Sequence, residues 1–105
     1  MKILTDAIEE LYEQSRKSPH KSLYLSVILQ AILDATKKGE ESEIRVYRDQ
    51  AQAWLFTSIG VTCENFELVC DYAGLSPEYV RKFAHHVVNS DNLVYIRKKI
   101  TTLLG

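Results

Sequence analysis

The segment 62–89 constrains the fold of this chain more than any other part of its sequence. Gly74 follows the small residue Cys70 by four positions, and glycine adopts a left-handed backbone more freely than any other residue. Val80 and Phe83 come six and nine residues after Gly74 and fall on one face of a helix. This spacing predicts two short helices that cross closely and are joined by a tight turn, as in a helix-turn-helix.

The residues after the glycine predict how the second helix of this unit begins. Ser76 is a favoured N-cap, and Pro77 suits the first helical position because its missing N–H would have no partner there. The two helices are expected at 63–73, with Thr62 as the N-cap, and at 77–88. A helix held in this way can enter the major groove of DNA with its outer face.

Helical spacing also continues outside this unit. Apolar residues from Leu4 to Tyr12 predict a first helix that fades near residues 15–17. A second helix is expected to begin near residues 19–22 and to end at 37 or 38, with Gly39 at its cap. A third should begin between residues 42 and 47 and run to 58, with a brief extended start at Ile44 and Val46 as an alternative, and a last one should span 92–104.

The second helix is predicted to be the centre of the domain. One apolar stripe along it consists of Leu23, Val27, Ala31 and Ala35. Further apolar residues widen this stripe, namely Leu25, Ile28, Leu29, Ile32 and Leu33. Such width predicts burial on more than one side. Together these periodicities predict a single, compact all-α domain, residues 1–105, with five to six helices.

Composition and charge limit the classes of function. The formal net charge is −1, which argues against indiscriminate nucleic-acid binding but leaves room for a local basic face. Cys63 and Cys70 would lie about 10.5 Å apart along one helix, beyond disulfide reach, and two free thiols fit a reducing compartment. No leader pattern or bilayer-length apolar run is evident, so we expect a cytoplasmic protein of a bacterium or a phage-infected cell.

Three motifs lie between Val27 and Ala84: LQAxxDA, then AxAWL, then FxxVCxxxGLxPxxVR. The matching positions are Leu29-Gln30-Ala31, Asp34-Ala35, Ala51, Ala53-Trp54-Leu55, Phe66, Val69-Cys70, Gly74-Leu75, Pro77, Val80 and Arg81. The combination resembles a group of small helix-turn-helix-like proteins encoded by phages and prophage-like elements of proteobacteria. The resemblance implies a helical fold and a role in transcription control, and it brings no catalytic residues.

The leading hypothesis from the sequence is a small transcription regulator of phage or prophage type that binds DNA. The expected contacts come from the second motif helix and from the basic side of the last helix: Ser76, Tyr79, Arg81, Lys82, His85, Arg97, Lys98 and Lys99. Arg81 or Lys82 would contact guanine or phosphate, and Ser76 or Tyr79 would contact phosphate. A homodimer would fit this function, because one short motif rarely supplies enough affinity alone.

A second hypothesis is a protein-interaction module that binds a host protein, such as RNA polymerase, without contacting DNA. It is motivated by the near-neutral charge and by the acidic residues of the first motif helix, Glu64, Glu67 and Asp71. It is also motivated by the six tyrosines and by Trp54. If Trp54 or Phe56 were exposed, that exposure would indicate a protein interface.

No pattern in the sequence indicates an enzyme, a cofactor or a metal. His85 and His86 would point about 100° apart on a helix, and no CxxC or HxxxH spacing supports a metal site. Cys70 is better explained as the small residue at a helix crossing than as a nucleophile. No glycine-rich phosphate loop occurs. We therefore expect no catalytic residues, no metal and no cofactor.

Overall fold

The part of the chain that the structure describes folds into six α-helices and contains no strand. The structure is a computed structural model that describes residues 2–104, with the side chains of residues 7–13 and 16–104. The side chain of Leu4, expected on the first helix, lies outside these residues. The all-α prediction is confirmed by α1 (Lys2–Ser15), α2 (Pro19–Ala35), α3 (Ser42–Phe56), α4 (Val61–Ala73), α5 (Pro77–Val88) and α6 (Leu93–Leu104).

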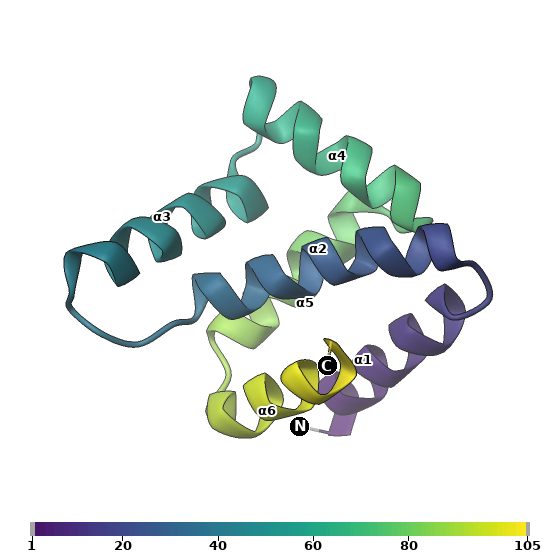
Figure 1. Cartoon of the computed structure of the whole chain (residues 1–105), viewed down its shortest axis with the longest axis horizontal. Helices are drawn as coiled ribbons and strands as arrows, with labels where there is room; N and C mark the ends of the chain where they lie inside the picture. Colours follow the sequence, from purple (N-terminus) through teal and green to yellow (C-terminus); the bar gives the residue numbers. More distant parts are fainter. Residues whose placement is uncertain (1, 105) are drawn as a thin grey trace.

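Helix α2 forms the centre of the molecule, as predicted (Figure 1). Helices α3 and α4 lie on one side of it, α1 and α6 lie on the other, and α5 passes behind it. Each of these five helices packs against α2. The radius of gyration is 13.2 Å, close to the value of about 13 Å expected for a compact domain of this length.

The core forms around the inward side of α2. All five residues that were predicted to widen its apolar stripe are buried: Leu25, Ile28, Leu29, Ile32 and Leu33. Every other helix adds buried side chains to the same core, among them Ile8, Leu55, Phe66, Val80 and Ile100. The core is therefore continuous across the six helices, and each helix contributes one apolar face to it.

Helix α2 ends earlier than the sequence predicted. It stops at Ala35, with Thr36 as the C-cap, rather than just before Gly39. The Thr36 hydroxyl donates to the carbonyl oxygens of Ile32 (2.8 Å) and Leu33 (3.2 Å), so that a side chain closes the last turn. Thr36 is buried by the surrounding helices, and this environment favours the internal hydrogen bonds over bonds to water.

Helix α4 begins earlier than predicted. It starts at Val61 with Gly60 as the N-cap, so the prediction of Thr62 as the N-cap is wrong. Gly60 adopts φ 91° and ψ −172°, a conformation that is open mainly to glycine. The Glu64 N–H donates to the Gly60 carbonyl oxygen at 3.0 Å, which makes this the first helical hydrogen bond. The backbone conformation of Gly60 therefore sets where α4 begins.

Helix α3 begins at Ser42, within the predicted range, so the alternative of an extended start at Ile44 and Val46 does not form. The Arg45 N–H donates to the Glu41 carbonyl oxygen at 3.0 Å and begins the helix. Helix α3 also ends at Phe56, slightly before the predicted end at residue 58. In the helical conformation Val46 lies on a side of α3 that is exposed to solvent.

Candidate functional site

The turn between α4 and α5 has the local geometry that the sequence predicted. Gly74 adopts a left-handed conformation (φ 75°, ψ 30°), and its N–H donates to the carbonyl oxygen of Asp71 at 2.9 Å. The side chain of Ser76 accepts a hydrogen bond from the Tyr79 N–H at 3.4 Å, and Pro77 is the first helical residue. These contacts fix the direction in which α5 leaves the turn.

The outer face of α5 is exposed to solvent. Its exposed side chains include Glu78, Tyr79, Lys82, His85 and His86. The His85 ring stacks on Phe56, with 4.2 Å between the ring centroids, and is thereby held against the end of α3. Lys82 forms no ion pair with a described residue. With Glu78 and Lys82 on the same face, this surface carries no strong excess of positive charge.

Arg81 is directed away from that face, toward the ends of α3 and α4. Its guanidinium donates to the carbonyl oxygens of Leu55 (3.3 Å) and Thr57 (3.0 Å) and to the sulfur of Cys63 (3.2 Å). It also lies 4.7 Å from the centroid of the Phe66 ring. The last carbonyl groups of a helix have no partner within the helix, and Arg81 supplies donors to the end of α3. Its charge is therefore engaged inside the molecule.

Two of the three cations of α6 are engaged as well. Arg97 donates to the hydroxyl oxygen of Thr36 and to a backbone carbonyl in the last turn of α2. Lys99 forms a 2.7 Å ion pair with Glu9 of α1, and this hydrogen bond raises the pKa of Lys99. Lys98 is exposed and forms no ion pair with a described residue.

The structure therefore divides the residues predicted to contact DNA into two groups. The exposed group consists of Ser76, Tyr79, Lys82, His85 and Lys98. The group with partners inside the molecule consists of Arg81, Arg97 and Lys99. Of the Lys and Arg residues that were expected to contact DNA, only Lys82 and Lys98 have neither an ion pair nor a hydrogen bond to a described residue.

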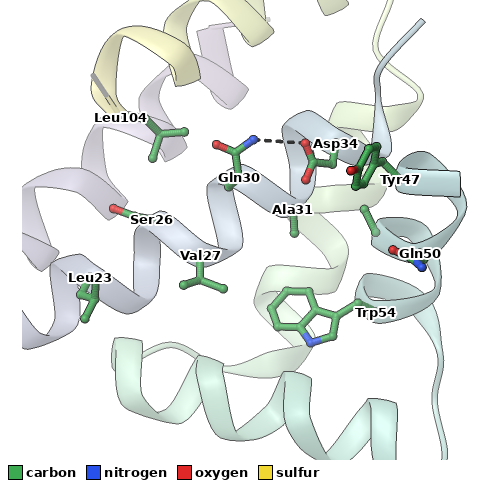
Figure 2. A pocket seen from close by; sticks show the side chains of 11 residues that line it. Leu23, Ser26, Val27, Gln30, Ala31, Asp34, Tyr47, Gln50, Trp54 and Leu104 are labelled. Atoms are coloured by element: carbon green, nitrogen blue, oxygen red, sulfur yellow. Dashed lines mark hydrogen bonds between the residues drawn. The ribbon is translucent and has the colours of Figure 1, made fainter. Parts of the chain in front are cut away.

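A second surface, which the sequence did not predict, lies on the side of α2 that faces away from the core (Figure 2). Here α2 and α3 line a groove of about 630 Å³ that is open to solvent. Leu23 and Val27 are 62% and 43% exposed along it. We call this the α2–α3 groove, and its lining residues are Leu23, Ser26, Val27, Gln30, Ala31, Asp34, Tyr47, Gln50, Ala51, Trp54 and Leu104.

The stripe of Leu23, Val27, Ala31 and Ala35 is thus not buried along its whole length, because no helix covers Leu23 and Val27. The sequence contains a signal for this exposure. Ser26, Gln30 and Asp34 follow one another at four-residue intervals and form a polar row beside the two apolar residues. Polar side chains on a side that is fully buried would need internal partners, so such a row marks a face in contact with water.

Trp54 forms one wall of the groove. Its ring N–H donates to the Asn65 side-chain oxygen of α4 at 2.7 Å, and its ring meets Phe66 edge-on with 5.0 Å between centroids. The single polar atom of the indole is therefore satisfied, and the rest of the ring offers apolar contact. Gln30 and Asp34 are bonded to each other at 3.1 Å (Figure 2). The groove thus presents apolar walls with its polar groups largely paired.

Comparison of the chain with protein-family models, with curated proteins and with solved structures gives no match. The resemblance to small phage-encoded proteins therefore stays a prediction that rests on the motifs. Several of the motif residues line the α2–α3 groove, namely Gln30, Ala31, Asp34, Ala51 and Trp54. The arginine that ends the third motif is Arg81, which joins α5 to α3 and α4.

The described residues do not assemble a metal site. Among them, no group of three or more His, Cys, Asp or Glu side chains is placed to hold an ion.

Cys70 is fully buried, and burial raises its pKa to about 12, which keeps the thiol protonated near neutral pH. No helix between residues 2 and 104 combines the length and apolarity needed to cross a bilayer.

Proposed function

We propose that this protein is an interaction module that binds a helical segment of another protein in the α2–α3 groove. The observation that carries this proposal is the exposure of Leu23 and Val27 beside Trp54. Exposed apolar side chains that line a groove are typical of surfaces that receive the apolar face of a partner helix. A host protein of the transcription machinery is the class of partner expected from the sequence.

The dimensions of the groove support a short helix as its occupant. From Leu23 to Asp34, α2 advances about 16 Å, or about three helical turns. Beside it, Tyr47 and Gln50 also line a smaller hollow of about 300 Å³ that includes Val46, so the surface continues along α3. A partner helix with apolar residues at every third or fourth position could cover this length.

The chemistry of the groove supports useful affinity. Covering an exposed aliphatic side chain such as Leu23 or Val27 contributes on the order of 1 kcal/mol. Tyr47 and Trp54 add aromatic surface, and aromatic side chains dominate binding energy at many interfaces. Because the indole N–H of Trp54 is already bonded, no polar group of that ring would be left without a partner in a complex.

The test uses two substitutions that change the groove without touching the core. Leu23→Asp combined with Val27→Asp should abolish partner binding, because two carboxylates would be desolvated in the complex. Val94→Asp on α6 is the matched control, since Val94 is 72% exposed and does not line the groove. The full chain and both variants would be used as bait, after circular dichroism has shown that all three are folded.

The expected result is one polypeptide that co-purifies with the wild type and the Val94 variant but not with the double variant. The purified partner should then change the fluorescence of Trp54, which is the only tryptophan and lines the groove. Retention of the same partner by the double variant would overturn the proposal.

DNA binding through the α4–α5 unit, as a homodimer, is the second candidate function. The geometry of the turn at Gly74 and the exposure of Tyr79 and Lys82 on α5 support it. It ranks second because cations that neutralise phosphates supply much of the affinity for DNA, and among the expected Lys and Arg residues only Lys82 and Lys98 are without internal partners.

A matched pair of variants tests this second candidate. If α5 binds DNA, Lys82→Ala with Lys98→Ala should weaken binding to duplex DNA and reduce the slope of log affinity against log salt by about 2. Lys17→Ala with Lys38→Ala removes the same charge from exposed positions elsewhere and should change little. Equal affinities of the two variants in filter binding would exclude a contact through α5.

A further inference from the structure

We propose that Asp34 sets the register of the helix received by the α2–α3 groove, because it requires a hydrogen-bond donor at the partner position that covers it. This inference rests on the proposed function and adds one feature of the partner to it. It follows from the place of Asp34 at one end of the groove and from the part of its carboxylate that has no partner in the protein.

The chemistry of the α2–α3 groove changes along its length (Figure 2). Leu23 lies at one end of the lining residues of α2, and Asp34 lies at the other end, beside Tyr47 of α3. Leu23 and Val27 offer exposed apolar surface. Among the described residues that line the groove, Asp34 is the only charged one. The groove therefore has an apolar end and a polar end.

Asp34 lies on the same side of α2 as Leu23 and Val27. Val27 follows Leu23 by four residues and Asp34 follows Val27 by seven, which correspond to about one and two turns of an α-helix. Seven residues advance a helix by about 10.5 Å. A partner helix that runs along α2 and contacts Val27 with one side chain would therefore cover Asp34 with the side chain seven positions away.

The carboxylate of Asp34 is only partly satisfied by the protein. Its Oδ1 atom accepts a hydrogen bond from the side-chain amide of Gln30 at 3.1 Å, and the Lys37 ammonium group lies 3.9 Å from the same atom. Among the described residues, none donates a hydrogen bond to the Oδ2 atom. The side chain is 29% exposed, so water can reach this oxygen in the free protein.

A helix bound over Asp34 would exclude this water. If an apolar side chain covered the carboxylate, the Oδ2 atom would lose its hydrogen bonds to water and gain none in return, which weakens binding. A partner amide or hydroxyl group would replace the water, whereas a partner carboxylate would be repelled. Asp34 therefore discriminates between helices that share the same apolar residues.

Peptides that differ at one guest position test this inference on the full chain. Each would be a helix of about 14 residues, without tryptophan, that carries the same apolar residues and has Gln, Leu or Glu at the guest position. This position follows the apolar anchor by seven residues in one series and precedes it by seven in the other, so that both directions along α2 are sampled. In one series, Trp54 fluorescence should show the Gln peptide binding about tenfold more tightly than the Leu peptide, and the Glu peptide binding most weakly.

Substitutions at Asp34 identify the source of the preference. Asp34→Leu should reverse it, so that the Leu peptide binds more tightly than the Gln peptide. Asp34→Asn should keep the preference for Gln over Leu, because its amide oxygen still accepts, but the Glu peptide should no longer be the weakest, because the amide also donates. The matched control, Asp49→Leu, makes the same change at an exposed position of α3 that does not line the groove, and it should leave the order unchanged.

The outcomes separate this inference from the function on which it rests. The role of Asp34 would be refuted if the Leu peptide bound the wild type as tightly as the Gln peptide in both series, if Asp34→Leu did not reverse the order, or if no peptide bound. The groove function would still stand on the loss of the native partner in the Leu23 and Val27 double variant. If that variant kept its partner, both proposals would fail.

Discussion

Arg81 and Lys82 are adjacent in the chain, but they have different surroundings. Arg81 donates to Leu55 and Thr57 and lies over the Phe66 ring, whereas Lys82 is exposed. Neighbours on a helix point about 100° apart, so one can face a crevice while the other faces water. The planar guanidinium offers several donors in one plane together with a face that can cover an aromatic ring, and a lysine ammonium group offers neither.

Replacing Arg81 should therefore affect stability rather than act only on a binding surface. Arg81→Ala should lower the free energy of unfolding by about 2–3 kcal/mol, because the carbonyl oxygens at the end of α3 lose their donors. Arg81→Lys should cost about 1–2 kcal/mol, since one ammonium group cannot replace the planar donor set. Lys82→Ala is the control and should change the value by less than about 0.5 kcal/mol. Urea denaturation measures the free energy of unfolding of all three variants. Equal effects of Arg81→Ala and Lys82→Ala would contradict the structural role of Arg81.

The thiol of Cys70 gives a prediction for alkaline pH. Burial raises the pKa of Cys70 from 9.0 to about 12, so the folded state holds this proton more tightly than the unfolded state. The resulting stabilisation is fully present below pH 9 and is lost as the pH rises from 9 toward 12. Cys70→Ala should therefore lose less stability than the wild type between pH 9 and about pH 11. If the wild type and Cys70→Ala gave parallel curves of unfolding free energy against pH, the thiol of Cys70 would not contribute to the loss of stability at alkaline pH.

At the scale of the helices, two kinds of helix end occur in this molecule. The junction of α4 and α5 is made by neighbours in sequence, with Gly74 in the left-handed region and Ser76 as the cap. The end of α2 depends on distant residues as well, because Thr36 closes the last turn and also accepts a hydrogen bond from Arg97 of α6. The first kind can be predicted from a short window of sequence, and the second cannot.

Substitutions at Gly74 test the local junction. Gly74→Ala should cost about 1–2 kcal/mol, because a residue with a Cβ is strained at positive φ. The added Cβ would lie 3.2 Å from the Lys21 Cε atom, but that side chain is flexible, so most of the cost should come from the backbone. Gly74→Asn should cost less than Gly74→Ala, because Asn tolerates this conformation better. Thermal denaturation compares the two variants, and an equal loss in both would argue against backbone strain as the cause.

At the scale of the whole molecule, five helices pack around α2 but leave one of its sides open. The molecule is flattened, with extents of 39, 33 and 22 Å. Its accessible surface is 6694 Å², somewhat more than the value of about 6,000 Å² expected for a compact monomer of this mass. The open apolar side of the central helix supplies the proposed binding surface.

The two sides of α2 should therefore respond differently to truncation. Ile32→Ala should lower the free energy of unfolding by about 2–4 kcal/mol, because Ile32 is completely buried and the substitution leaves a cavity. Leu23→Ala should cost less than about 1 kcal/mol, because most of this side chain is already in water. The affinity for the partner should show the reverse order, so that Leu23→Ala weakens binding more than Ile32→Ala does. The prediction would be wrong if Leu23→Ala destabilised the fold as strongly as Ile32→Ala.

Much of the fold could be predicted from local patterns. The apolar periodicity indicated the helices and the central position of α2, and the residues around Gly74 indicated the turn and the start of α5. These features depend on interactions between residues only a few positions apart, which a sequence displays directly. Even the boundary that was missed at Gly60 is local, since it depends on the φ angle of a single glycine.

The candidate sites depended on contacts between distant segments. Arg81 donates hydrogen bonds to the carbonyl oxygens of Leu55 and Thr57 at the end of α3. These residues precede it by more than 20 positions, and only the packing of α5 against α3 places them within reach. Apolar periodicity showed that α2 is apolar on a wide arc, and the polar row of Ser26, Gln30 and Asp34 indicated one side in contact with water. Only the packing of the other helices decided that Leu23 and Val27 would remain uncovered. A side chain carries the same chemistry wherever it stands in a helix. Whether that side chain is buried in the core or stays exposed for binding depends on which other helices pack against it.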